Sequence, residues 1–335
     1  MKIVLPGRKS GLNGLVISGL LLGSTIMLSG CAMLSEGEAT IENKPEEIFV
    51  TLKGSGQIAK YPGQVIFEGA PVMLYNAITP DGKRLVVSSP KKMRVYVFDT
   101  VTGKQLAQVK VGKASKGLKI SPNGKEVYVA NEGEATVSVV NLDSYQVVAT
   151  IKTEDMPHNV RFSDDGKKAY VTLQGGAGLG VIDTKTREVI KVIPVPGIIG
   201  AHNLDLSKDG AIAFIRDTAG SVAVLDLMTD EVKKIIRVGN GHAGIDVVPN
   251  GKLVFTGAIA DDFIAVIDSS TFEVIKKIKV GFGPHGVRAT KDGRFVYVTV
   301  TADNKVEVID VKTLSVVKRY DVKDFPFWVA VNGNP

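Results

Sequence analysis

The four histidines of the chain are the residues best suited to chemistry, and they are regularly placed. His158, His202 and His285 each precede an Asp-Gly pair by seven residues, and His242 precedes an Asn-Gly pair by eight. Imidazole is the commonest metal ligand among protein side chains, and a set made only of histidines suits copper, zinc or iron. The spacing therefore predicts that one structural unit, used repeatedly, brings these imidazoles together.

The same stretches of sequence carry a second group of polar side chains. In an earlier stretch Lys116 takes the place of the histidine, and in two others Leu74 and Phe327 do so. Three or four residues after the histidine position, five stretches carry a charge: Lys119, Arg161, Asp205, Asp246 and Arg288.

Two interpretations of these charges are open. They could line a channel that selects an anion, or they could form salt bridges between neighbouring stretches, Arg161 with Asp205 and Asp246 with Arg288. In the second case two lysines would be left as unpaired cations able to attract a carboxylate or phosphate of a ligand, namely Lys116 and Lys119.

An internal repeat positions these residues. Asp-Gly or Asn-Gly pairs begin at Asp81, Asn123, Asp165, Asp209, Asn250 and Asp292, with spacings of 42, 42, 44, 41 and 42 residues. Such pairs suit tight hairpins because both positions tolerate positive φ. A period near 42 residues matches one four-stranded blade of a β-propeller.

Each repeat has a recognisable end to its third strand. We expect these strands to end at Asp99, Asp143, Asp183, Asp226, Asp268 and Asp310. Five of the six have Thr three residues later, a pattern typical of turns in which both side chains bond the local backbone. These aspartates are therefore interpreted as structural turns, not as ligands.

The two ends of the repeat region are expected to complete one further blade. Residues 327–333 have the character of an innermost strand, and strand-like pieces at 48–52, 56–59 and 65–68 can supply the outer strands. The prediction is an all-β fold: a single seven-bladed β-propeller over residues 47–335, with the last blade shared by N- and C-terminal strands. Its third to sixth blades would then present the four histidines around one mouth of the central channel.

Two motifs carry a family resemblance. Val127-Tyr128-Val129-Ala130-Asn131 and Val296-Tyr297-Val298-Thr299 resemble the Tyr-Val-Thr-Asn family of β-propeller repeats, and the resemblance covers residues 47–335. That family is related to the haem d1-binding propeller of cytochrome cd1 nitrite reductase. The resemblance implies the propeller fold and adds haem d1 to copper and zinc as a candidate ligand, while a histidine arc that binds nothing is equally open.

The N-terminal segment has the pattern of an export signal. Lys2, Arg8 and Lys9 precede an apolar run, and Leu28-Ser29-Gly30-Cys31 resembles a bacterial lipobox. We expect a signal peptide at 1–30, lipidation of Cys31, a tether at 31–46 and a cell-envelope location on the periplasmic face or the cell surface. The alternatives are a plain signal peptide or an uncleaved membrane helix.

Composition excludes several classes of function. Lipidation would use the single Cys, so that no disulfide or thiol nucleophile would remain. Loss of the signal would lower the formal net charge from +6 to +3, and no block of like charges indicates nucleic-acid binding. Motifs of serine hydrolases, phosphate-binding loops, zinc proteases and c-type haem attachment are absent from the sequence.

Three functions remain open. The first is a lipid-anchored binding protein that presents a histidine-lined face to a small ligand, to a metal or haem, or to a protein partner of the envelope. The second is a redox enzyme dependent on haem d1 or copper, or a factor that assembles such a cofactor. The third is a structural interaction scaffold whose histidine arc has no ligand.

Overall fold

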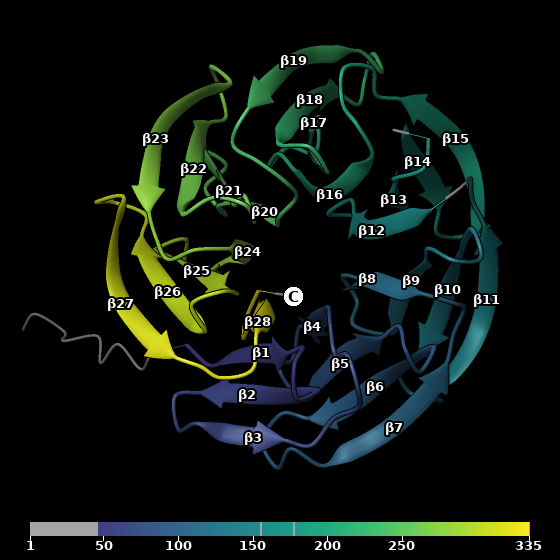
Figure 1. Cartoon of the computed structure of the whole chain (residues 1–335). Helices are drawn as coiled ribbons and strands as arrows, with labels where there is room; N and C mark the ends of the chain where they lie inside the picture. The colour runs from purple at the N-terminus through teal and green to yellow at the C-terminus, as the bar shows by residue number, and fades with distance from the viewer. Residues whose placement is uncertain (1–45, 155, 177, 335) are drawn as a thin grey trace, which may run out of the picture. The chain divides into compact units, whose positions relative to one another are not determined.

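The computed structural model describes residues 46–154, 156–176 and 178–334. The predicted signal peptide, Cys31 and, apart from Glu46, the predicted tether lie outside the described residues. The described chain forms seven four-stranded antiparallel sheets and contains no helix, so none there is long and apolar enough to span a membrane. The sheets are arranged around a central channel as blades (Figure 1), which confirms the predicted seven-bladed propeller.

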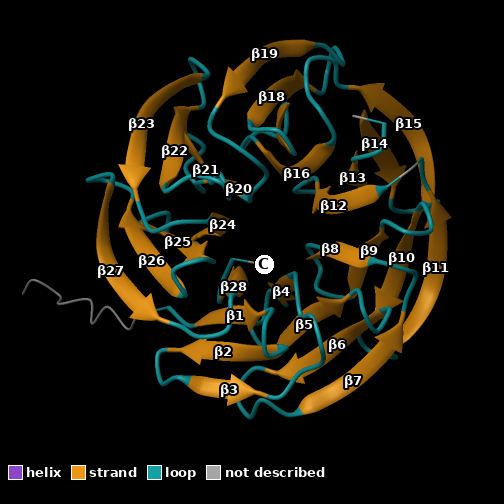
Figure 2. Cartoon of the chain, viewed as in Figure 1, coloured by secondary structure: helices purple, strands orange, loops and turns teal. Residues whose placement is uncertain are grey.

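Every blade runs from an innermost to an outermost strand (Figure 2). The innermost strands are β4 (Asn76–Ile78), β8 (Ser115–Ile120), β12 (Pro157–Phe162), β16 (Ala201–Leu206), β20 (Ile245–Val247), β24 (Pro284–Ala289) and β28 (Pro326–Val331). The second strands are β5 (Arg84–Ser89), β9 (Glu126–Asn131), β13 (Lys168–Leu173), β17 (Ile212–Asp217), β21 (Leu253–Thr256), β25 (Phe295–Val300) and β1 (Ile48–Leu52). The third strands are β6 (Arg94–Asp99), β10 (Thr136–Asn141), β14 (Gly178–Asp183), β18 (Ser221–Asp226), β22 (Phe263–Asp268), β26 (Lys305–Asp310) and β2 (Gln57–Tyr61). The outermost strands are β7 (Gln105–Lys110), β11 (Gln146–Lys152), β15 (Glu188–Pro194), β19 (Val232–Arg237), β23 (Glu273–Lys279), β27 (Ser315–Asp321) and β3 (Val65–Phe67).

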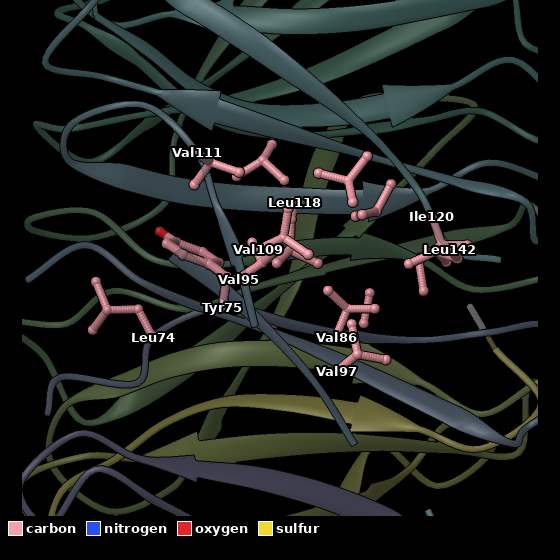
Figure 3. Packing of buried hydrophobic residues seen from close by; sticks show 14 of the residues in the cluster. Leu74, Tyr75, Val86, Val95, Val97, Val109, Val111, Leu118, Ile120 and Leu142 are labelled. Carbon is pink, nitrogen blue, oxygen red and sulfur yellow. The ribbon is translucent and has the colours of Figure 1, made fainter. Parts of the chain in front are cut away.

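The hydrophobic core lies between the faces of neighbouring blades. Figure 3 shows one such layer, in which Val86 and Val97 of one blade lie near Leu118 of the next. The second and third strands are rich in Val, Ile and Tyr because both of their faces are covered by adjacent blades. The outermost strands are largely exposed, as the burial pattern of β11 shows. Burial thus increases toward the channel, where polar groups need partners.

The ring closes in the blade that both ends of the repeat region build. Strand β28 pairs with β1 in antiparallel register, with Phe49 opposite Ala330 and Val50 opposite Val329. Trp328 is buried, and its backbone N–H donates to the hydroxyl of Thr51 at 3.0 Å. The predicted shared blade is therefore confirmed, and β28 covers the channel-facing edge that β1 would otherwise leave unpaired.

The turns after the third strands are built as predicted in five blades. Asp99 Oδ1 accepts hydrogen bonds from the backbone N–H and the hydroxyl of Thr102, at 2.7 and 2.8 Å. The prediction of Asp143 is wrong, because β10 ends at Asn141. Asn141 Oδ1 accepts from the N–H and hydroxyl of Ser144, at 2.8 and 3.1 Å, so an amide and a serine close the same turn.

A register shift explains how two side chains three residues apart can line one channel. In a regular strand such residues would face opposite sides. The pairing of β12 with β13 shifts between Pro157 and Val160, which lie on either side of His158. Comparable shifts occur in β8, β16 and β24. The extra residue lets His158 and Arg161 both line the channel, one toward each mouth.

Candidate functional site

The structure brings the four histidines together at one mouth of the channel. His158, His202 and His285 lie on β12, β16 and β24, and His242 lies just before β20. Ring centroids of consecutive histidines are 3.8, 4.5 and 5.3 Å apart, and the rings of His202 and His242 are stacked. The four imidazoles therefore form a continuous arc.

Two further aromatic side chains close this arc into a ring. Phe327 lies 4.1 Å from His285, Tyr75 lies 5.5 Å from Phe327, and Tyr75 lies 5.7 Å from His158, measured between ring centroids. We call this end of the channel the histidine mouth, defined by Tyr75, His158, His202, His242, His285 and Phe327. Leu74, which was predicted at the equivalent position, and its neighbour Tyr75 both line the mouth.

His158 belongs to a hydrogen-bonded chain. Its Nδ1 lies 3.3 Å from Glu132 Oε1, and its Nε2 lies 2.9 Å from the hydroxyl of Tyr75. Because a carboxylate only accepts, Nδ1 carries the hydrogen and Nε2 accepts from Tyr75. Glu132 Oε2 also pairs with Lys116 Nζ at 3.2 Å, and its Oε1 accepts from Gln174 Nε2 at 3.2 Å. The interpretation of Lys116 as an unpaired cation is therefore wrong.

The imidazoles of the other three histidines make fewer hydrogen bonds. His285 Nδ1 donates to the carbonyl oxygen of Phe327 at 2.9 Å, so its Nε2 is an acceptor. This Nε2 and His202 Nδ1 are buried without a hydrogen-bond partner in the described part of the chain. Within the same residues, the imidazoles of His202 and His242 make no hydrogen bond. These two rings are available to a ligand.

Burial keeps all four imidazoles neutral at pH 7. Burial first, and then the neighbouring histidines and cations, lower the pKa of His242 to about 4 and that of His285 to about 3. Burial also lowers the pKa of His158, although Glu132 opposes the shift. The pKa of His202 lies well below its usual value because of burial and the three other histidines. Neutral imidazoles can donate, accept or ligate.

A pocket of about 320 Å³ opens at the histidine mouth. Four of its polar lining residues each follow the second strand of a blade by one position: Lys53, Glu132, Gln174 and Thr218. The pattern of the innermost strands alone does not reveal these four residues. Their common position in the repeat is the signal that could have found them, since the loop after a second strand returns to the mouth at which the innermost strand begins.

The donor set does not assemble a four-histidine metal centre. No group of three His, Cys, Asp or Glu side chains in the described residues could hold a metal ion. Both nitrogens of His158 are hydrogen-bonded, and Nδ1 of His285 is taken by a carbonyl. A copper or zinc ion held by all four imidazoles therefore does not fit. A haem iron needs one axial imidazole, which His202 or His242 can supply.

The opposite end of the channel, which we call the charged mouth, is formed by Lys119, Arg161, Asp205, Asp246 and Arg288. Both salt bridges expected between blades are present: Arg161 Nε lies 3.1 Å from Asp205 Oδ1, and Arg288 Nη1 lies 2.9 Å from Asp246 Oδ1. Arg161 Nη2 lies 3.9 Å from Asp246 Oδ1 and links the two pairs. Lys119 interacts electrostatically with both carboxylates, so its interpretation as unpaired is wrong as well.

Each aspartate of the charged mouth also binds the backbone of the next blade. Asp205 Oδ2 accepts from the N–H of Val247 at 2.8 Å, and Asp246 Oδ2 accepts from the N–H of Ala289 at 2.6 Å. These are the innermost strands β20 and β24. Both carboxylates therefore hold adjacent blades together, and this use of them is structural.

Comparison with known proteins supports the fold. Residues 207–334 match the model of the YNCE-like beta-propeller family. The chain is similar to YNCE-like propellers. No curated protein sequence matches it.

Solved structures of similar fold share little sequence with the chain. Hydrazine synthase of Kuenenia stuttgartiensis is 20% identical with a TM-score of 0.71, over 81% of this chain and 92% of that one. A functionally unknown protein from Desulfotomaculum acetoxidans is 14% identical with a TM-score of 0.73, over 87% and 100%. Dihydro-heme d1 dehydrogenase NirN, solved in complex with DHE, is 18% identical with a TM-score of 0.65, over 86% and 75%.

Proposed function

We propose that the chain is a lipid-anchored binding protein of the cell envelope that takes a small ligand at the histidine mouth. The observation that carries the proposal is the pair His202 and His242. Both imidazoles line the pocket and neither makes a hydrogen bond within the described residues. A concave site with convergent polar groups and strongly shifted pKa values is typical of a binding site.

The walls of the pocket indicate the chemistry of its ligand. The circle of aromatic side chains at the histidine mouth favours a flat, partly apolar molecule. The stacked imidazoles of His202 and His242 can each accept or donate one hydrogen bond. Lys53 Nζ lies 5.4 Å from the ring centroid of Phe327, which adds a cation at the rim. About 320 Å³ is near the lower limit for small-molecule pockets, about 300 Å³.

The test begins with full-length protein purified from its native host. Native mass spectrometry should detect a co-purifying ligand that is lost from the double variant His202→Ala/His242→Ala. The variant His285→Asn is the matched control, because His285 belongs to the same ring but does not line the pocket. Loss of the ligand from the control alone, or no ligand in any preparation, would overturn the proposal.

A haem-type ligand is the second candidate, and with it a role as a redox enzyme or a cofactor-assembly factor. It is supported by the neutral imidazoles that line the pocket and by the shared fold with NirN, which was solved with DHE bound. A bound haem would supply redox chemistry at its iron, and His202 or His242 would hold that iron. Titration with haemin should then give a changed absorption spectrum in the wild type but not in the double variant.

The anchor is proposed from the motif Leu28-Ser29-Gly30-Cys31. The variant Cys31→Ser should leave the propeller folded and release it from the membrane fraction. The substitution removes the proposed site of lipidation, and stable anchoring needs two or more acyl chains. Fractionation of cells followed by immunodetection measures this. A variant that still fractionates wholly with membranes would contradict lipidation of Cys31.

A further inference from the structure

A groove of about 500 Å³ lies beside the histidine mouth, between the blade of β12–β15 and the blade of β16–β19. The described residues that line it come from the loops that enter β12 and β16 and from the loops that follow β13 and β17. Two of these residues, Gln174 and Thr218, also line the pocket of the histidine mouth. The groove, which we call the side groove, therefore adjoins that pocket.

The side groove differs from both mouths of the channel in its chemistry. None of the described residues that line it carries a charge. Besides Gln174 and Thr218 they are three glycines and three apolar residues, Met156, Ile198 and Ile199. Such a lining suits an uncharged apolar group, whereas the polar groups of the adjoining pocket suit a polar one.

The backbone of Ile199 is fixed so that its side chain stays at the surface. Its carbonyl oxygen accepts hydrogen bonds from the hydroxyl and the backbone N–H of Thr218, at 2.5 and 3.1 Å. Its own N–H donates to Asp217 Oδ2 at 3.3 Å. The residue is 71% exposed, while its neighbour Ile198 is part of the core. A bound apolar group would remove this preordered apolar surface from water, at no cost for ordering the loop.

Gly200 keeps open the junction between the side groove and the pocket. Its φ is +68°, which favours glycine. A Cβ at this position would lie 3.1 Å from the carbonyl oxygen of Gln174 and 3.2 Å from the hydroxyl oxygen of Thr218. These are the two residues that the groove and the pocket share, so a side chain here would crowd the space between them.

We propose that the ligand of the histidine mouth is an amphiphile. Its flat polar head lies against His202 and His242, and its aliphatic chain lies in the side groove. The inference rests on the function proposed above for the histidine mouth, and it adds the class of molecule that binds there.

The experiment is calorimetric titration of the full-length protein with phenol, para-ethylphenol, para-butylphenol and para-hexylphenol. All four probes have the same flat ring and single hydroxyl, and only the chain differs. We expect the dissociation constant to fall about threefold to fourfold for each added methylene, as for one buried CH₂ group.

Variants of the groove separate the chain from the head. Ile199→Ser and Met156→Ser should each weaken the dependence on chain length and leave the binding of phenol unchanged. Ile199→Leu keeps the apolar surface and should retain the dependence. Phe282→Ser is the matched control, because Phe282 is an exposed apolar residue before β24 that lines neither the groove nor the pocket.

Three results would overturn the inference. They are the absence of binding of every probe, affinity that does not rise with chain length, and an equal effect of Phe282→Ser and Ile199→Ser. Self-association of the unliganded protein that Ile199→Ser abolishes, measured by analytical ultracentrifugation, would also overturn it, because a second copy of the chain would then occupy the groove.

The double variant His202→Ala/His242→Ala distinguishes the groove from the proposed function. Phenol binding that this variant loses, combined with no dependence on chain length in the wild type, would overturn the groove and leave the proposed function standing. A dependence on chain length that persists in the double variant would support the groove and contradict the role of the two histidines.

Discussion

The two mouths of the channel are built from the same innermost strands but stabilise buried polar groups in opposite ways. At the histidine mouth, imidazoles remain neutral and pack against Tyr75 and Phe327. At the charged mouth, the guanidinium groups of Arg161 and Arg288 pair with aspartates of neighbouring blades. Burial of polar groups is thus tolerated either by losing charge or by pairing it.

The difference between the mouths predicts where the propeller is most sensitive to substitution and to pH. A paired charge left alone in a buried site is far more costly than a neutral ring that loses one hydrogen bond. Single substitutions should therefore act most strongly at the charged mouth, whereas changes of pH should act most strongly at the histidine mouth.

The largest effect is expected from Asp246→Ala. This change leaves Arg288 without its carboxylate and the N–H of Ala289 without its acceptor. We expect the free energy of unfolding to fall by about 3–5 kcal/mol, as for other broken buried ion pairs. Urea unfolding followed by the fluorescence of Trp328, the single tryptophan, measures it. A loss below about 1 kcal/mol would mean that the charged mouth is well solvated.

Lowering the pH should destabilise the protein through the histidine mouth. In the unfolded chain the imidazoles bind protons near pH 6.5, whereas the folded pKa is about 4 for His242 and about 3 for His285. The unfolded state therefore binds more protons between pH 6.5 and about 4, and stability is lost as the pH falls through that window.

The expected loss between pH 7 and 5 is at least about 2 kcal/mol. Urea unfolding at several pH values measures it, and His285→Gln should give a shallower dependence on pH because one shifted histidine is removed. Equal slopes for variant and wild type would show that His285 is not protected from protonation.

A smaller effect is expected from Tyr75→Phe. The change removes the hydroxyl that lies 2.9 Å from Nε2 of His158 and leaves this nitrogen buried without a donor. Stability should fall by about 1–2 kcal/mol. The fluorescence of Trp328 should also change, since its ring lies 4.7 Å from that of Tyr75. Unchanged stability would indicate that water replaces the hydroxyl.

The smallest effect should come from Lys116→Gln at the histidine mouth. This change removes a partly exposed ion pair with Glu132 and should cost less than about 1 kcal/mol. Thermal melts at low ionic strength compare the variant with the wild type. A loss as large as that caused by Asp246→Ala would break the comparison between the mouths.

The fold could be predicted because its information is local and repeated. Asp-Gly and Asn-Gly turns recur at nearly constant spacing, and each marks the same hairpin. The one error among the third strands, at Asp143, arose because Asn141 and Ser144 perform the same bonding with different side chains. The residue types at this turn differ from those of the other blades, whereas the hydrogen bonds are of the same kind.

The site was less predictable because its partners come from loops and from distant blades. The histidines and their arc follow from the repeat. Tyr75, however, reaches His158 from a non-adjacent blade, and Glu132 reaches it from the neighbouring blade. Whether Lys116 is paired depends on Glu132, and no spacing within the innermost strands reveals that contact. The low pKa values follow from burial, which becomes known only with the packing.

The register shift in the innermost strands has a consequence for engineering. In the blades of β8, β12, β16 and β24, one extra residue separates two positions that line the channel. Each of these blades therefore carries two channel-lining side chains that can be changed separately, as His158 and Arg161 illustrate in β12. Substitutions at one of the two positions would change the charge of one mouth, one blade at a time, and would leave the other mouth unchanged. The histidine mouth and the charged mouth can then be changed separately without redesigning the propeller.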